Sequence, residues 1–251
     1  ASTRPTVSVL VSSYNYAAFV VEAIESVFAQ TEAALEIMIV DDGSRDGSLA
    51  QLRELDFGSW HDPGTPASIL TLRELLTLTL DWRRPVRLFI ETKHPVRFGS
   101  LVEQKLLEML HEFGVATPPS ADHSRAVVIS FSSAGVWRIR RHAPMLPTIL
   151  LGDTARVLGG SAATAVGATG IGPSVETLRM HPEIVDKAAA AGRVTYCWTV
   201  DDPADVELCK RLGVDWIGTN FPARTLARVN EDEQMRAAEI GTVHGSFADR
   251  D

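Results

Sequence analysis

Cysteine is scarce in this chain, which has two cysteines in 251 residues, Cys197 and Cys209. They do not form a Cys-x-x-Cys pair, and one lies in an expected strand and the other in an expected helix. Zinc and redox sites use closer spacing, and small disulfide-stabilised secreted folds use more cysteines. We therefore expect two buried free thiols in a reducing compartment.

Positive charge and long apolar runs are lacking as well. The 24 Lys and Arg residues are outnumbered by 32 Asp and Glu, which leaves a formal net charge of −8 at pH 7. This balance argues against nucleic acid or an anionic membrane as the main partner, and it suits a site for a divalent cation. We expect no leader peptide and no membrane span, since no apolar run approaches the roughly 18 residues that a span needs. The expected location is the cytoplasm, and the composition leaves the oligomeric state open.

Glycine is missing where a dinucleotide-binding fold needs it, because no Gly-x-Gly-x-x-Gly follows the first expected strand. Short apolar, β-branched runs instead alternate with amphipathic helical stretches along the chain. The expected strands are 7–13, 36–42, 86–93, 126–132, 148–152, 170–174, 193–200 and 216–220. Eight strands separated mostly by helices predict an α/β fold with a parallel sheet closed into a (β/α)₈ TIM-type barrel. An open doubly wound sheet is the alternative.

The chain shows no linker that would divide it into domains. The Gly/Pro-rich loop at 56–70 is short and is flanked by expected helices. We therefore expect one barrel domain over 1–230, followed by a frayed acidic tail at 231–251 in which helical periodicity is lost.

The later part of the chain carries several long and specific motifs. They read LRELDFGSWHDP, FIETKHPVRFGSLVEQKLLEML, AVVISFSSAGVWRIRRHAP and TYCWTVDDPADVELCKRLGVDWIGTNFP. On these motifs, residues 52–229 resemble the glycerophosphodiester phosphodiesterase family. The resemblance implies a barrel with its site at the carboxyl ends of the strands. It also implies metal-dependent hydrolysis of a small glycerophosphodiester to glycerol 3-phosphate and an alcohol.

The same resemblance assigns roles to four residues. Glu91 of the Glu91-Thr92-Lys93 motif corresponds to a ligand of the divalent cation, Ca²⁺ or Mg²⁺, both of which prefer carboxylate oxygens. Lys93 corresponds to a catalytic cation that faces the phosphate, and Phe131 and Trp198 correspond to residues lining the glycerol side of the pocket. The residues alone leave alternatives open: Glu91 and Lys93 also suit a plain ion pair, and the two aromatic rings also suit core packing.

The chain departs from the family pattern at its catalytic histidines. The family carries His-Arg-Gly after the first strand and His-Asp about forty residues later, whereas here the first strand ends in Ser12-Ser13-Tyr14-Asn15. A His61-Asp62 dipeptide is present, but it lies in the loop that follows GSW. Because a general acid or base typically contributes about 10²–10⁴-fold, we expect impaired hydrolysis.

The beginning of the chain has a different likeness. The segments VSVLVSSYN, AAFVVEAIESVFAQ and EIMIVDDGSRDGS make residues 6–49 resemble the start of a family-2 glycosyltransferase. The resemblance implies that Asp41 contacts the base of a nucleotide sugar, although the later Asp-x-Asp that binds Mn²⁺ is not found. A nucleotide-sugar-binding fragment and an inactive hybrid scaffold are therefore alternatives to the phosphodiesterase.

Both families begin with a strand, a helix and a strand, so the two likenesses are compatible with one fold. We expect a barrel with a hybrid first βαβ unit, in which a glycosyltransferase-like segment at 1–50 precedes a phosphodiesterase-like remainder at 51–230. In such a barrel Asp41 and Asp42 follow the second strand and are candidate metal ligands together with Glu91. The alternative is that Asp42-Gly43-Ser44 forms a turn that caps the next helix.

Overall fold

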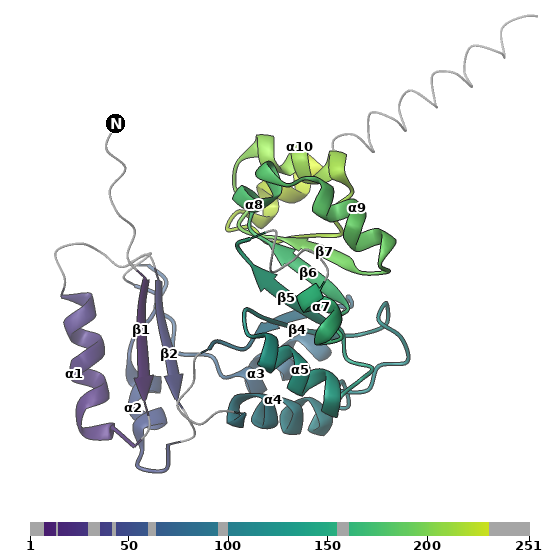
Figure 1. The fold of residues 1–251 in the computed structure, drawn as a ribbon. Helices are drawn as coiled ribbons and strands as arrows, with labels where there is room; N and C mark the ends of the chain where they lie inside the picture. Colours follow the sequence, from purple (N-terminus) through teal and green to yellow (C-terminus); the bar gives the residue numbers. More distant parts are fainter. Residues whose placement is uncertain are drawn as a thin grey trace, which may run out of the picture. The chain divides into compact units, whose positions relative to one another are not determined.

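The computed structural model describes residues 8–13, 15–29, 36–41, 44–59, 64–94, 100–154 and 161–230. The chain divides into two compact units, Ala1–Leu78 and Thr79–Asp251, and each has its own sheet (Figure 1).

The N-terminal unit is built on a pair of parallel strands. β1 (Ser8–Ser13) pairs with β2 (Glu36–Asp41) through the crossover helix α1 (Ala17–Phe28), and α2 (Ser48–Glu54) follows β2. Val20 and Ile24 lie one helical turn apart on α1 and form a buried cluster with Leu52 of α2. The unit therefore has a small apolar core of its own.

One carboxylate joins the starts of both helices in this unit. Asp46 Oδ2 accepts a hydrogen bond from the Ala17 amide at 2.9 Å, and Oδ1 accepts from the Ser48 hydroxyl at 2.5 Å. These bonds, first that of Ser48 and then that of Ala17, lower the pKa of Asp46. Ser44 Oγ also accepts from the Asn15 amide at 2.8 Å. The described capping atoms thus belong to Asp46, whereas Ser44 holds the segment before α1; Asp42 and Gly43 lie outside the described residues.

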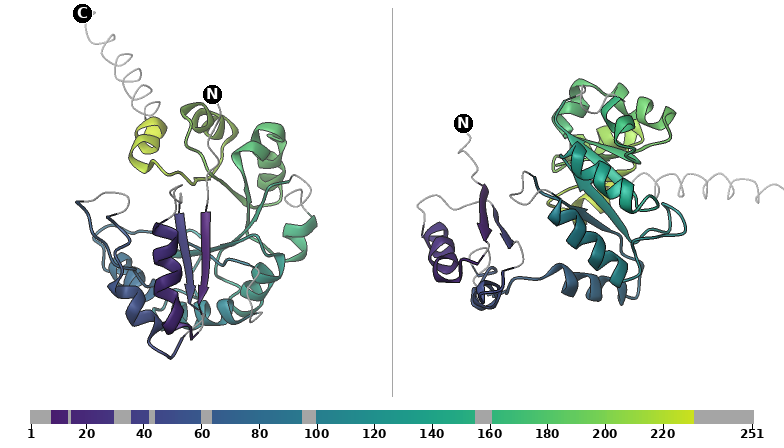
Figure 2. Two further views of the ribbon diagram at one scale, coloured as in Figure 1. Left: turned by 90° about the vertical axis from the view of Figure 1, so that its left-hand side faces the viewer. Right: turned by 60° about the horizontal axis from the view of Figure 1, so that its bottom comes forward.

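The C-terminal unit contains a six-stranded parallel sheet whose strands follow the order of the sequence. The strands are β3 (Leu88–Glu91), β4 (Ala126–Ser130), β5 (Thr148–Gly152), β6 (Gly170–Pro173), β7 (Val194–Cys197) and β8 (Trp216–Ile217). The helices are α4 (Leu101–Glu112), α5 (Ser133–His142), α7 (Ser161–Ala165), α8 (Val175–Met180), α9 (Glu183–Ala190), α10 (Pro203–Leu212) and one at 222–230, while α3 (Leu72–Leu80) spans the boundary between the units. Figure 2 shows helices of this unit outside its curved sheet.

The strand composition explains the burial of this sheet. All five residues of β4 and all five of β5 are buried, as expected for parallel strands covered on both faces. Leu150 of β5 belongs to a buried cluster with Val136 of α5 and Ile184 of α9. The core therefore lies between the sheet and its outer helices.

Aromatic rings inside the sheet show how strongly it is curled. Phe89 of β3 lies 5.2 Å from Trp216 of β8 and 5.3 Å from Tyr196 of β7, measured between ring centroids. Five strand spacings of about 4.8 Å would separate the first and last strands of a flat sheet by roughly 24 Å. The sheet must therefore curl like the wall of a barrel, and the parallel barrel-type α/β fold expected from the sequence is confirmed.

The expected elements agree closely with those observed. Each of the eight expected strands has a counterpart within a few residues, whereas α7 and α8 were not expected because both are short. No helix in the described ranges is long and apolar enough to cross a bilayer. A single barrel domain over 1–230 stays a prediction, and the tail at 231–251 lies outside the described residues.

Replacing Leu150 with alanine should lower the free energy of unfolding by about 2–5 kcal/mol, because the substitution leaves a cavity in the core. Met145→Ala is the matched control, since Met145 is 50% exposed whereas Leu150 is 0% exposed. Urea unfolding followed by circular dichroism measures both variants. An equal loss in the two variants would contradict this account of the core.

Candidate active site at the carboxyl ends of the strands

Parallel strands bring their carboxyl ends to one rim of the sheet. Glu91 is the last residue of β3, and its register partner is Ile129 of β4. Phe131 directly follows β4, and Trp198 directly follows β7 and forms a bridge with Ser174 after β6. Predicted site residues far apart in sequence therefore occupy one end of the C-terminal unit.

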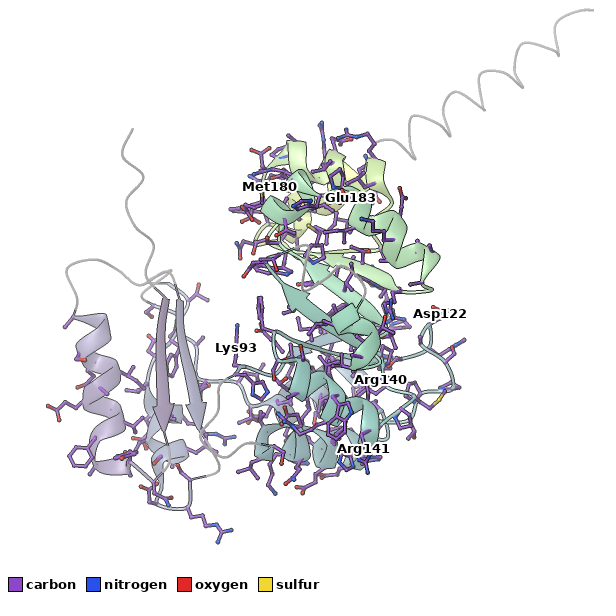
Figure 3. The ribbon with its side chains drawn as sticks, in the orientation of Figure 1. Lys93, Asp122, Arg140, Arg141, Met180 and Glu183 are labelled. Carbon is purple, nitrogen blue, oxygen red and sulfur yellow. The ribbon has the colours of Figure 1, made fainter. Side chains whose placement is uncertain are left out.

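Glu91 and Lys93 form an ion pair at this rim. Lys93 Nζ lies 2.9 Å from Glu91 Oε2, with the Lys93 side chain 45% exposed and that of Glu91 24% exposed. Figure 3 shows the Lys93 side chain standing out from the ribbon. The sequence alternative of an ion pair is thus observed, but an exposed pair of this kind is worth little stability. Lys93 is accessible to an anionic ligand.

Phe131 and Trp198 form an aromatic pair next to the strand ends. Their rings meet edge to face at a centroid distance of 5.3 Å, and the Trp198 indole donates to the Gly172 carbonyl at 2.8 Å. Phe131 is 45% exposed, which is unlike a core residue. The pair therefore presents a fixed apolar surface to solvent, with its indole N–H already engaged.

Tyr196 is a polar group of this region that the sequence analysis missed. Burial raises its pKa, and the negative charge of Glu91 raises it further. The phenol thus lies within the electrostatic reach of Glu91, and a side chain at Gly218 would overlap its hydroxyl. An aromatic residue in an alternating apolar strand is typical of core packing, so the sequence offered no signal of this contact.

Asp201 was also missed and lies after β7. Its carboxylate accepts from the Thr219 hydroxyl at 3.0 Å and from the Asn220 amide and side chain, each at 2.8 Å. Burial opposes its ionisation, but these hydrogen bonds outweigh burial and lower its pKa. Asp201 therefore ties the loop after β7 to the loop after β8.

The donor set for a cation is only partly described. No cluster of three or more His, Cys, Asp or Glu side chains that could hold a metal occurs in the described part of the chain. Glu91 fits one of the one or two carboxylates through which Mg²⁺ is commonly held, whereas Ca²⁺ takes six to eight oxygens and needs further donors. Asp41 ends β2, but its side chain, like all of Asp42, lies outside what the structure describes.

The two cysteines are buried free thiols, as expected. Cys197 and Cys209 are hydrogen-bonded to each other, and this bond together with burial raises the pKa of Cys197. The neutral thiol is therefore the stable form of Cys197.

Comparison with solved structures identifies the fold. A glycerophosphodiester phosphodiesterase from Parabacteroides distasonis has a TM-score of 0.61 and 21% identity, covering 73% of this chain and 71% of its own. An Oleispira antarctica phosphodiesterase in complex with its product sn-glycerol-3-phosphate has a TM-score of 0.60 and 16% identity, covering 73% of this chain and 70% of its own. The C-terminal unit thus has the barrel-type fold of phosphodiesterases.

Sequence comparison then identifies the family. The model of the glycerophosphoryl diester phosphodiesterase family matches residues 32–224. A probable glycerophosphodiester phosphodiesterase 1 from Mycobacterium tuberculosis is 60% identical over 186 residues, which cover 72% of this chain and 68% of the relative. The chain belongs to the glycerophosphoryl diester phosphodiesterase family, whose enzymes generally depend on a divalent metal.

The second expected likeness is confirmed as a short match. An uncharacterized glycosyltransferase from Nostoc is 53% identical over 51 residues, which is 19% of this chain and 16% of the relative. The phosphodiesterase family match begins at residue 32, so it already includes β2, which we had placed in the glycosyltransferase-like segment. This strand is therefore compatible with both families.

Glu91→Gln should lower the pKa of Tyr196 toward the usual value of about 10, because the negative charge of Glu91, one of the causes that raise it, is removed. The pKa should stay above 10 because the phenol remains buried. Ultraviolet titration of each protein against its Tyr196→Phe counterpart isolates this tyrosine. Because the pKa of Tyr196 is raised in the folded protein, the neutral phenol stabilises the fold at pH values below its unfolded-state pKa of about 10. This stabilisation is lost as the pH rises through the folded-state pKa of Tyr196. An unchanged titration curve would show that Glu91 does not reach Tyr196.

Proposed function

We propose that this protein binds small glycerophosphodiesters at the rim of the C-terminal unit and hydrolyses them slowly to glycerol 3-phosphate and an alcohol. The observation that carries the proposal is the accessible Glu91–Lys93 pair on the same rim as the Phe131–Trp198 pair. The assignment is supported by family membership and by the bound product in the Oleispira antarctica structure. The two buried thiols favour the cytoplasm as the location.

Lys93 is the group that binds the phosphate in this proposal. Its ammonium is held by the partly exposed carboxylate of Glu91 at 2.9 Å, so a phosphate oxygen can take over this interaction at small cost. A cation placed there also stabilises the negative charge that develops on the phosphoryl oxygens during hydrolysis. Lys93 is thus assigned to both binding and catalysis.

Glu91 is assigned to the divalent cation, Ca²⁺ or Mg²⁺, while Asp41 and Asp42 stay candidate ligands on their sequence positions alone. When bound, such a cation neutralises charge on the phosphoryl group and orients it. Release of Lys93 to the substrate would free Glu91 Oε2 for the cation, because the ammonium now lies 2.9 Å from that oxygen. Exchange of partners at Glu91 therefore couples the two binding events.

Phe131 and Trp198 are assigned to the glycerol moiety. Because the indole N–H already donates to Gly172, Trp198 offers its apolar ring and not a hydrogen bond. The two rings can therefore cover the carbon backbone of glycerol while its hydroxyls face water or other polar groups.

The slow turnover follows from the absence of the family's His-Arg-Gly and His-Asp motifs from their expected places in the sequence. Lys93 supplies charge, but an ammonium held by a carboxylate does not replace a histidine acid and base. We therefore expect this protein to bind glycerophosphodiesters but to hydrolyse them slowly.

Lys93→Met should weaken the binding of glycerol 3-phosphate in the presence of Mg²⁺ by about tenfold or more, because a charged hydrogen bond to phosphate is lost. Isothermal titration calorimetry measures the dissociation constant. Lys105→Met is the matched control, since Lys105 is also paired with a glutamate, Glu108, at 2.8 Å but belongs to the exposed face of α4.

Equal affinity in the two lysine variants would contradict the assignment of Lys93. Binding of UDP without binding of glycerol 3-phosphate would contradict the proposal itself and favour the nucleotide-sugar alternative.

Hydrolysis of glycerophosphocholine should be at least about 100-fold slower than that by the Mycobacterium tuberculosis relative, because two proton-transfer groups are missing. Release of choline with and without Mg²⁺ or Ca²⁺ measures both proteins under the same conditions. Equal rates would show that other groups replace the histidines.

A further inference from the structure

A buried carboxylate lies directly behind the proposed site. Glu103 is in the first turn of α4 and is 1% exposed, which makes it one of the least exposed charged residues described. Burying a carboxylate is costly unless it is paired and hydrogen-bonded. Its position therefore depends on the groups that face it.

Two side chains converge on one oxygen of this carboxylate. Arg138 of α5 donates from Nη2 to Glu103 Oε1 at 2.8 Å, and His94 Nε2 lies 2.9 Å from the same oxygen. The His94–Glu103 contact is a close ion-pair contact and not a hydrogen bond, since His94 Nε2 is among the buried side-chain atoms that have no hydrogen-bond partner in the described part of the chain. Glu103 Oε2 has no hydrogen-bond partner among the described residues. The carboxylate is thus committed to holding His94 and Arg138 together.

His94 connects this group to the site, because it directly follows Lys93 in the chain. Thr92, between Glu91 and Lys93, is held from the other side: its amide donates to the Ile129 carbonyl at 3.0 Å, and its carbonyl accepts from Ser130 Oγ at 2.9 Å. The segment that carries both charged site residues is therefore anchored at Thr92 by β4 and at His94 by Glu103.

The close approach of these groups depends on Gly135 in the first turn of α5. A Cβ atom at this position would lie 2.8 Å from Glu103 Oε1 and 3.0 Å from His94 Nε2. The Gly135 amide donates to Ser132 Oγ at 3.0 Å, which caps α5. The glycine and its cap thus leave room for Glu103 and His94 to meet against α5.

We propose that Glu103 is a positioning residue, which holds His94 and thereby sets the orientation of Lys93 and Glu91 toward the phosphate. The inference rests on the proposed function for the orientation of Lys93, but the anchoring of residues 91–94 stands without it. Arg138 orients the carboxylate from α5. A 1 Å error in the placement of a reacting group can cost on the order of 100-fold, so an anchor of this kind matters for binding and turnover.

Three variants separate positioning from general stability. Glu103→Ala removes the anchor, and Glu103→Gln keeps a side-chain oxygen that can accept from Arg138 and still contact His94. Asp205→Ala is the matched control, because Asp205 is also a buried carboxylate that accepts from one arginine, Arg179, at 2.8 and 2.5 Å. Asp205 lies on α10, whose contacts do not include residues 91–94 among the interactions described.

Hydrogen exchange of residues 91–94 and the affinity for glycerol 3-phosphate with Mg²⁺ are then measured in the full chain, well below every melting temperature. In Glu103→Ala, amide protection at 91–94 should fall and the dissociation constant should rise, each by about 10- to 100-fold. Glu103→Gln should recover most of both losses. Asp205→Ala should lower the melting temperature without changing either value.

Unchanged protection at 91–94 in Glu103→Ala, or an equal loss in Asp205→Ala, would overturn the positioning role. Should Glu103→Ala not fold, Arg138→Met decides in the same way, since it removes the arginine that orients the Glu103 carboxylate toward His94 and changes no residue of 91–94. If the wild-type protein binds no glycerol 3-phosphate while Glu103→Ala still loses protection, the proposed function fails and the anchoring role stands.

Discussion

The parallel register of β3 to β8 is the constraint on which the chemistry of this protein depends. Neighbouring strands all run in the same direction, so the residues after the strands meet at one rim although they are far apart in sequence. The curl of the sheet adds a second effect, because it brings β7 across to β3 and places Tyr196 within the field of Glu91. A flat sheet with the same residues would hold these two side chains apart.

The order and type of the strands could be predicted because buried parallel strands have a distinctive composition. The apolar runs at β4 and β5 are flanked by helices, and this pattern indicates buried parallel strands. Glu91 and Lys93 could be found because a specific motif carries them. The place of Tyr196 at the site could not be predicted, since its interaction with Glu91 arises from the curl of the sheet. The short helices α7 and α8 could not be predicted either, because they lack a full amphipathic repeat. Burial of Glu103 is likewise invisible in a sequence where glutamate in the first turn of a helix is typical of an exposed face.

Charged pairs divide into two kinds in the C-terminal unit. Glu103 and Asp205 are buried carboxylates held by arginine, and removing one partner of such a pair leaves an uncompensated charge, which commonly costs about 3–5 kcal/mol. Lys93 is exposed and Glu91 is partly exposed, so this pair can change partners at little cost. The C-terminal unit therefore combines firmly held pairs with a pair that is free to exchange partners.

The Asp46 carboxylate shows how locally the opening segment of the chain is encoded. It satisfies the first turns of α1 and α2 at once, and the cluster of Val20, Ile24 and Leu52 lies within the same stretch. The capping and the core of this βαβα segment are thus encoded locally. A segment that supplies its own caps and core can keep its local structure beside different sequences, which is compatible with the short glycosyltransferase match found for this family member.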